Sequence, residues 1–113
     1  MNKEFYKNWR NQARKGLLEL AILNDINKRK MYAYEIEKKF CKSQGVVLSA
    51  GSIYNILKRF KNQKLVKTRV DNSPNGPKRK YYKLTKLGYE TLVQMNGSWH
   101  AIRKALDSIE KGI

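Results

Sequence analysis

The segment from Ser49 to Gln63 carries the residues best suited to chemistry, and that chemistry is the noncovalent binding of a polyanion. Amides, hydroxyls and cations recur along it without a single carboxylate. Asparagine can pair with adenine and lysine can reach guanine, whereas small polar and basic groups suit phosphates. We expect base contacts from Ser52, Tyr54, Asn55 and Lys58. We expect phosphate contacts from Gln12, Ser49, Gly51, Lys61, Lys78, Arg79 and Lys80. For Tyr54, a half-buried ring with its hydroxyl on a phosphate is an equal alternative.

The same segment is predicted to be a helix with one buried face. Its apolar residues recur at i, i+3, i+4 and i+7, the period of one helical stripe, and they are Ile53, Ile56, Leu57 and Phe60. Ser49 is a good N-cap, yet no acid follows in the first turn, so the positive helix end is open to a phosphate. Taken alone, an ordinary solvated basic helix is an equally good interpretation.

The composition favours a nucleic-acid partner. The chain has 113 residues, with 25 Lys and Arg against nine Asp and Glu, giving a formal net charge of +16. This charge destabilises a compact chain unless a polyanion neutralises it, and nucleic acid or an anionic membrane would do so. Between Lys38 and Tyr89 there are fourteen basic residues and one acid, Asp71. A protein that coats nucleic acid by charge alone is therefore the alternative to a sequence-specific one.

Other functional classes find little support in the sequence. The single Cys41 predicts a reducing compartment and hence the cytoplasm. No apolar run approaches the roughly 18 residues of a membrane span, and the polar residues 1–15 do not resemble a signal peptide. Cys41 and His100 are too few for a metal site, and no catalytic constellation or phosphate-binding glycine loop occurs. We expect no enzyme activity, cofactor, metal or membrane partner.

The elements before this segment are predicted to complete a helix-turn-helix. A helix over Asn11–Asn27 is apolar around most of its circumference, which in a small chain favours contact with a second subunit. Residues 1–10 could form either an arm or an extra helical turn. A second helix is predicted over Met31–Cys41, followed by a turn at 43–45 and a short extended piece at 46–48. With the basic helix, these make the three-helix skeleton.

A basic hairpin is predicted next. The apolar period changes to two in residues 66–70 and 81–84, which predicts two strands. Turn-forming residues fill the segment from Asp71 to Pro77, and Asn75-Gly76 can take positive φ. The second strand follows Lys78-Arg79-Lys80. A basic hairpin after a basic helix is typical of a winged helix.

The last helix, capped by Thr85, carries an apolar seam. Apolar residues follow each other at spacings of three and four over three heptads, at Leu92, Met95, Trp99, Ile102, Leu106, Ile109 and Ile113. Such a narrow seam can be buried against a partner helix of similar length, and the simplest partner is a helix of a second copy. We therefore expect a homodimer that uses this helix.

These features together resemble the PadR family of bacterial transcriptional regulators, in its small subfamily with one C-terminal helix. The resemblance rests on the motifs at 14–20, 32–36, 48–60 and 76–85, and the last two are the most specific. It implies a homodimeric winged helix that binds a pseudo-palindromic operator on double-stranded DNA, with effectors relieving repression in some members. Three residues depart from the family pattern. Asn55 replaces a frequent Pro, Ala33 replaces a Gly, and Lys64 replaces the Gly that usually ends the recognition helix.

The resemblance also places Trp99 where some small members have a tryptophan lining a pocket at the dimer interface. A residue that large would hold two helices apart, although it could equally fill the seam. The expected lining is Leu17, Leu18, Ala21, Leu92, Met95, Trp99 and Arg103, and the seam residues Ile102, Leu106 and Ile109 continue the interface. Arg103 favours an anionic or neutral planar, small aromatic effector.

The sequence thus predicts a mainly α fold with a small antiparallel β hairpin. Residues 11–84 would form a winged helix-turn-helix DNA-binding domain, and residues 85–113 a dimerisation helix. The expected function is a dimeric sequence-specific transcriptional regulator, and the resemblance implies that it acts as a repressor. The alternative is a non-specific nucleic-acid-binding architectural protein.

Overall fold

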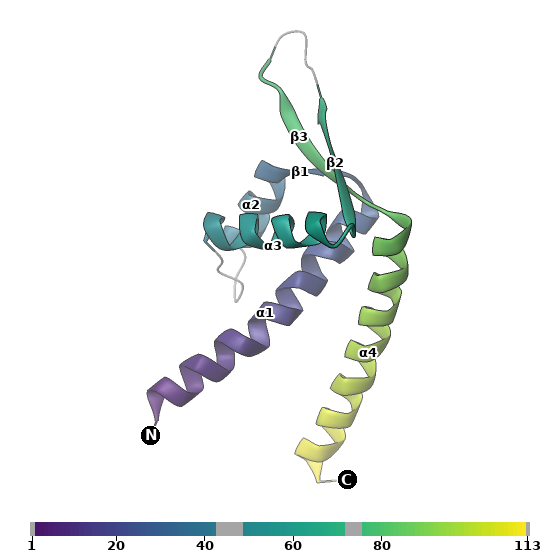
Figure 1. The fold of residues 1–113 in the computed structure, drawn as a ribbon. Coiled ribbons are helices and arrows are strands. Elements are labelled where there is room, and N and C mark those ends of the chain that lie inside the picture. Colours follow the sequence, from purple (N-terminus) through teal and green to yellow (C-terminus); the bar gives the residue numbers. More distant parts are fainter. Residues whose placement is uncertain (1, 43–48, 72–75, 113) are drawn as a thin grey trace.

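Four helices surround one side of a small antiparallel sheet. The computed structural model describes residues 2–42, 49–71 and 76–112. The elements are, in order, α1 Lys3–Lys28, β1 Met31–Tyr32, α2 Ala33–Lys42, α3 Ala50–Asn62, β2 Val66–Asp71, β3 Arg79–Leu84 and α4 Lys86–Lys111. The strand order is β1-β3-β2, with both pairings antiparallel. In Figure 1 the β2–β3 hairpin rises above the helices, and α1 and α4 diverge below it.

The fold agrees with the expected winged helix-turn-helix followed by a long helix. α3 has its N-cap at Ser49 and α4 at Thr85, as predicted. The stripe on α3 is buried, since Ile53, Leu57 and Phe60 are at most 2% exposed. The predicted turn at 43–45, the extended piece at 46–48 and most of the hairpin turn lie outside the described residues.

The helix predicted over Met31–Cys41 was wrong at its start. Met31 and Tyr32 form the strand β1, pairing with Tyr82 and Tyr81 of β3. The helix begins only at Ala33, because the Glu35 carboxylate accepts a hydrogen bond from the Tyr32 backbone N–H at 3.0 Å and so ends the extended segment. The sheet therefore has three strands instead of the predicted two.

The first helix begins eight residues earlier than the predicted Asn11. Asn2 caps it, its Oδ1 accepting from the Phe5 N–H at 2.9 Å, and Glu4 in the first turn complements the helix dipole. Residues 3–10 are thus helical, as an extension of the predicted helix. Their aromatic side chains are exposed, Phe5 by 70% and Trp9 by 57%.

The core lies where α1, α2, α3 and the start of α4 meet the inner face of the sheet. Its buried members are Leu18, Leu20, Ile22, Leu23, Ile26, Met31, Ile36, Phe40, Ile53, Leu57, Phe60, Val66, Tyr82 and Leu92. Because members come from every helix and every strand, the core orients α3 and the hairpin together. The stability of this core is what fixes the direction of the exposed face of α3.

The turn between α3 and β2 is held against the start of α4. Lys64 has φ of 61°, the left-handed conformation, and Leu65 N–H donates to the Phe60 carbonyl at 2.9 Å, which completes a Schellman ending. The Thr85 hydroxyl donates to the Lys64 carbonyl at 2.7 Å. A Cβ on Gly88 would lie 2.0 Å from the Leu65 carbonyl oxygen, so this approach requires glycine.

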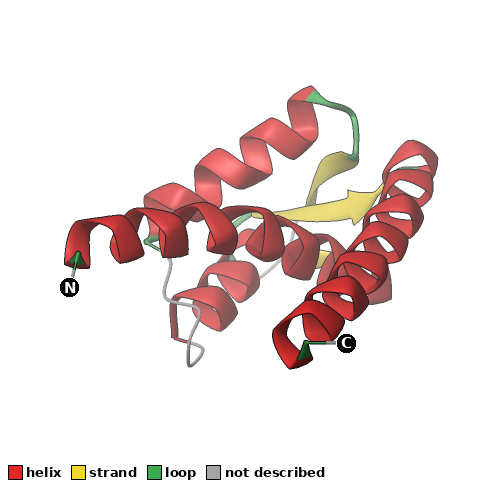
Figure 2. Cartoon of the chain, turned by 90° about the horizontal axis from the view of Figure 1, so that it is seen from below, coloured by secondary structure: helices red, strands yellow, loops and turns green. Residues whose placement is uncertain are grey.

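α1 and α4 are joined by a reciprocal pair of amide hydrogen bonds. Asn24 Nδ2 donates to Asn96 Oδ1 and Asn96 Nδ2 donates to Asn24 Oδ1, each at 3.0 Å. Each helix has 26 residues. The two helices diverge toward the N and C labels in Figures 1 and 2.

Candidate nucleic-acid interface

The outward side of α3 presents polar and cationic groups to solvent. The residues predicted to contact bases are all exposed, namely Ser52, Tyr54, Asn55 and Lys58. Ser49 Oγ accepts from the Ser52 N–H at 3.1 Å, which leaves further amides of the first turn available. No acid occurs in that turn. An anion approaching this end of α3 meets the positive helix terminus without a competing carboxylate on the helix itself.

A carboxylate nevertheless reaches α3 from another element. Glu19 of α1 is 8% exposed, and its Oε1 accepts a hydrogen bond from Arg59 Nη1 at 3.3 Å. Its Oε2 also forms an ion pair with Arg59 Nη2 at 3.1 Å. This pair was not predicted from the sequence, because the two residues are 40 positions apart. The available indication was that Glu19 is the one charged residue within the apolar run 17–23.

A groove runs between α1 and α3 beside the exposed face. Its volume is about 430 Å³, and it is lined by Asn11, Arg14, Lys15, Leu18, Ser52, Asn55, Ile56 and Arg59. This α1–α3 groove brings two residues predicted to contact bases next to basic residues of α1. Gln12 is exposed on α1 but does not line the groove. The α1 residues that face α3 are therefore Asn11, Arg14 and Lys15, and Arg14 makes contacts of its own within the chain.

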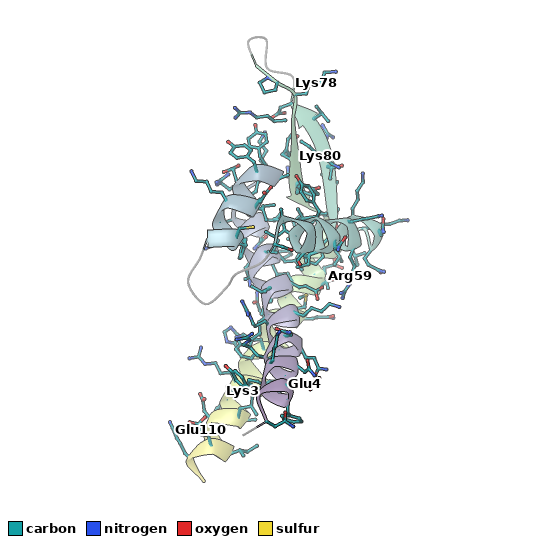
Figure 3. All side chains as sticks on the ribbon, turned by 90° about the vertical axis from the view of Figure 1, so that its left-hand side faces the viewer. Lys3, Glu4, Arg59, Lys78, Lys80 and Glu110 are labelled. Carbon is teal, nitrogen blue, oxygen red and sulfur yellow. The ribbon has the colours of Figure 1, made fainter. Side chains whose placement is uncertain are left out.

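The hairpin places cations on the other side of α3. Lys78 lies high on the hairpin and Lys80 lower down, while Arg59 lies on α3 (Figure 3). The Lys80 ammonium is 5.7 Å from the centroid of the Tyr82 ring. Burial of that ring raises the pKa of the Tyr82 hydroxyl, with a smaller effect from nearby Tyr54. Lys80 and Tyr54 are thus both near the same ring at the junction of α3 and the sheet.

Arg79 is tied to the start of α2. Its guanidinium lies 5.9 Å from the Tyr32 ring centroid and 5.4 Å from that of Tyr34, and Nη1 donates to the Tyr34 hydroxyl at 3.4 Å. The Tyr32 hydroxyl donates to Asp71 Oδ2 at 2.6 Å, and this hydrogen bond is the main cause of the raised pKa of Tyr32. These contacts anchor the strand ends next to the hairpin turn, Asp71 and Arg79, to β1 and α2.

The residues of the predicted interface pocket divide between core and surface. Leu18 and Leu92 are buried, and Ala21, Met95 and Trp99 are partly buried against the core. Leu17, Ile102, Leu106 and Ile109 are exposed in the single chain, Ile109 by 72%, and Arg103 is exposed on α4. The lower seam of α4 is thus an uncovered apolar row.

The described residues contain neither a group suited to a metal ion nor a helix suited to spanning a membrane. Among the described residues, no group of three or more His, Cys, Asp or Glu could hold a metal ion. Within the same residues, no helix combines the length and apolarity needed to cross a bilayer. His100 lies on α4 beside Arg103, Lys104 and Asp107 around a shallow polar hollow.

Residues 22–94 match the model of a protein family, the transcriptional regulator PadR-like family. This range includes α2, α3 and the hairpin. The chain belongs to the PadR-like family of transcriptional regulators. Membership of this family supports a DNA-binding transcriptional regulator.

Solved structures show the same fold. A PadR-like transcriptional regulator from Bacillus cereus shares 36% identity, with 90% of this chain and 99% of that chain covered and a TM-score of 0.80. A Streptococcus transcriptional regulator shares 27% identity, with 88% and 97% covered and a TM-score of 0.78. A curated relative from Lysinibacillus sphaericus, described as uncharacterized protein X, is 24% identical over 101 residues, covering 88% of this chain and 93% of its own. The likeness to these solved structures covers about nine-tenths of this chain.

Proposed function

We propose that this PadR-like regulator is a homodimeric repressor that binds a pseudo-palindromic operator, with one α3 in the major groove of each half-site. The observation that carries the proposal is the face of α3, where Asn55 and Lys58 are exposed on the side opposite the buried Ile53, Leu57 and Phe60. Bidentate amide and lysine contacts to base edges can discriminate among base pairs. Residues 11–84 act as the DNA-binding part, and residues 85–113 as the dimerisation helix.

Phosphate contacts flank the base contacts. Ser49, Gly51 and Lys61 supply them from α3, Gln12 from α1, and Lys78, Arg79 and Lys80 from the hairpin. Such contacts fix the register of α3 on the duplex without carrying sequence information. The dimer sets the two α3 helices about one DNA turn apart, roughly 34 Å.

A binding titration tests the sequence-specific function. We expect the protein to bind a palindromic duplex from the promoter upstream of its own gene much more tightly than a scrambled duplex at physiological salt. Replacing Asn55 by Ala should reduce that preference, and replacing Lys61 by Gln should weaken both complexes alike. Equal affinity for the two duplexes, with a steep salt dependence, would instead support an architectural protein that binds by charge alone.

An effector site at the dimer interface is the regulatory part of the proposal. Met95 and Trp99 of α4, like Ala21 of α1, are partly buried against the core, and Arg103 follows Trp99 one turn later on α4. An anionic or neutral planar molecule stacked on Trp99 would alter the spacing of the two α3 helices and release the operator. A panel of planar aromatic compounds, monitored by tryptophan emission, tests this. Trp9 also emits, so equal quenching of a Trp99→Ala variant would reject the site.

A further inference from the structure

The sheet has a second, open face, and the proposed operator contacts include only Arg79 at its far end, next to the hairpin turn. Side chains alternate along a strand, so Val66 and Tyr82 point into the core with the stripe of α3. Their neighbours Lys67, Tyr81 and Lys83 therefore lie on the opposite face. This outer face is directed away from α3, on the hairpin that rises above the helices in Figure 1.

Cations are crowded on the outer face. Lys67 lies directly opposite Lys83 in the β2–β3 ladder, and Arg69 lies opposite Tyr81. Like charges at directly opposed positions destabilise a sheet. In the part of the chain that the structure describes, these three cations form no ion pair. The repulsion is therefore left uncompensated by the protein.

The acid on this face is already engaged. Asp71 accepts from the Tyr32 hydroxyl at 2.6 Å and lies 3.7 Å from the Lys30 ammonium. The far end of the outer face, with Asp71 and Arg79, is thus satisfied by internal contacts. The end with Lys67 and Lys83 is not.

A hollow occupies the unsatisfied end. Its volume is about 140 Å³, and it is lined by Lys67, Arg69, Tyr81 and Lys83. The Lys30 ammonium lies 4.3 Å from the Tyr81 ring centroid, so Tyr81 is close to a fourth cation besides the three that line the hollow. An aromatic ring among cations is the chemistry that binds an unpaired base together with its flanking phosphates.

We propose that the outer face of the sheet binds single-stranded nucleic acid. One base lies in the hollow against the Tyr81 ring, and the neighbouring phosphates contact Lys67, Arg69 and Lys83. A duplex keeps its bases stacked inside the helix and cannot place one in the hollow. Because this face is directed away from α3, a single strand and an operator duplex can be bound at the same time. This activity goes beyond operator binding and does not depend on it.

Fluorescence polarisation with labelled 12-nucleotide oligo-dT and oligo-rU tests the proposal, and the two arms distinguish a DNA source from an RNA source. We expect Tyr81→Leu to weaken binding about tenfold and Tyr81→Phe to retain it, because phenylalanine preserves the stacking surface. The double variant Lys67→Gln/Lys83→Gln should weaken binding and reduce the salt slope by about 1.4, or roughly 0.7 for each phosphate that is no longer neutralised. The matched control, Lys104→Gln/Lys111→Gln on α4, removes the same charge away from the hollow and should bind like the wild type.

Several outcomes would overturn the proposal. They are an absence of binding to both oligonucleotides, an equal loss in the α4 control, and an unrelated duplex that displaces the single strand at equal concentration. Thermal melts of each variant separate binding from folding. If Tyr81→Leu is unfolded, the lysine double variant decides, since removal of an opposed like-charge pair should not lower its melting temperature. Failure of operator preference in the wild type would reject the proposed repressor and leave this result standing.

Discussion

Single residues at the ends of elements determine how α3 is presented. Lys64 occupies the left-handed position after α3 where the family usually has glycine, yet the Schellman hydrogen bonds from Lys64 and Leu65 are both formed. A side chain with a Cβ is disfavoured in this conformation by about 1–2 kcal/mol. The surrounding contacts, above all the Thr85 hydroxyl on the Lys64 carbonyl, offset that strain.

Lys64→Gly should therefore stabilise the protein by about 1 kcal/mol, because glycine adopts positive φ freely. Urea unfolding measures the change. The matched control is Lys61→Gly in the last turn of α3, which should destabilise by about as much. A Lys64→Gly variant that is less stable than the wild type would show that the lysine side chain makes a compensating contact.

Glu35 gives the fold a dependence on pH. Its pKa is lowered, first by the hydrogen bond from Arg29 and then by that from the Tyr32 backbone. A carboxyl whose pKa is lower in the folded chain stabilises the fold when the pH is above its pKa in the unfolded chain, which is about 4.3. This contribution is lost as the pH falls through the lower pKa of the folded chain. We expect the stability difference between wild type and Glu35→Gln to be largest near pH 6 and to shrink steadily as the pH falls below about 4.3, the unfolded value. Chemical unfolding across that range measures it, and a constant difference would contradict the assignment.

At the scale of elements, close packing of the α3–β2 turn on α4 fixes the recognition helix. The two glycines of α4 differ in this respect. A Cβ at Gly88 would collide with the Leu65 backbone, whereas a Cβ at Gly97 would meet nothing within 4 Å. One glycine is required by packing, and the other only lowers helix propensity.

Gly88→Ala should destabilise the protein by about 2–3 kcal/mol, since the backbone must move to admit the methyl group. Gly97→Ala is the matched control in the same helix and should stabilise it by about 0.5–1 kcal/mol. Thermal melting measures both variants, and we expect a lower melting temperature for Gly88→Ala and a higher one for Gly97→Ala. Similar effects from both substitutions would mean that helix propensity alone matters here.

Local patterns in the sequence predicted the elements that are stabilised locally. The stripe of α3, the caps Ser49 and Thr85, and the alternation of β2 and β3 all agree with the structure. The strand β1 was missed because two residues carry no period, and its existence depends on pairing with β3 some 50 positions away. The extra turns of α1 depend on the single cap Asn2.

Only part of the candidate site could be predicted from the sequence. The exposed residues of α3 follow from its period, and their DNA contacts stay predictions. The Glu19–Arg59 pair and the α1–α3 groove could not be predicted, because both arise from the crossing of two helices distant in sequence. The outer face of the sheet was also missed, since each strand was considered singly and the opposition of Lys67 to Lys83 appears only with the register.

At the scale of the whole molecule, the single chain leaves apolar surface uncovered. The described chain extends 60 Å along its longest axis, and the lower seam of α4 and the aromatic residues of α1 are exposed along it. A second copy would cover both in the proposed dimer. Affinity for a two-fold operator then depends on linking two binding units, which can strengthen binding by a factor of about 10² or more.

Leu106→Arg should therefore convert the protein to a monomer and lower operator affinity about a hundredfold or more. Light scattering gives the mass, and a gel-shift titration gives the affinity. Asp107→Arg, adjacent in α4 but off the seam, is the control and should remain dimeric. A dimeric Leu106→Arg protein with unchanged affinity would place the interface elsewhere.

The Asn24–Asn96 amide pair has a mechanical consequence for such a dimer. From Asn24 to the start of α1 the helix runs about 30 Å, at roughly 1.5 Å per residue. A rotation of about 5° at the pair would displace that tip by roughly 2–3 Å on this lever. Because Leu20, Ile22 and Leu23 on the same helix are buried in the core, the amide pair and the core together fix the angle at which α1 and α4 spread, and with it the distance between the helix ends that a second copy would have to bridge.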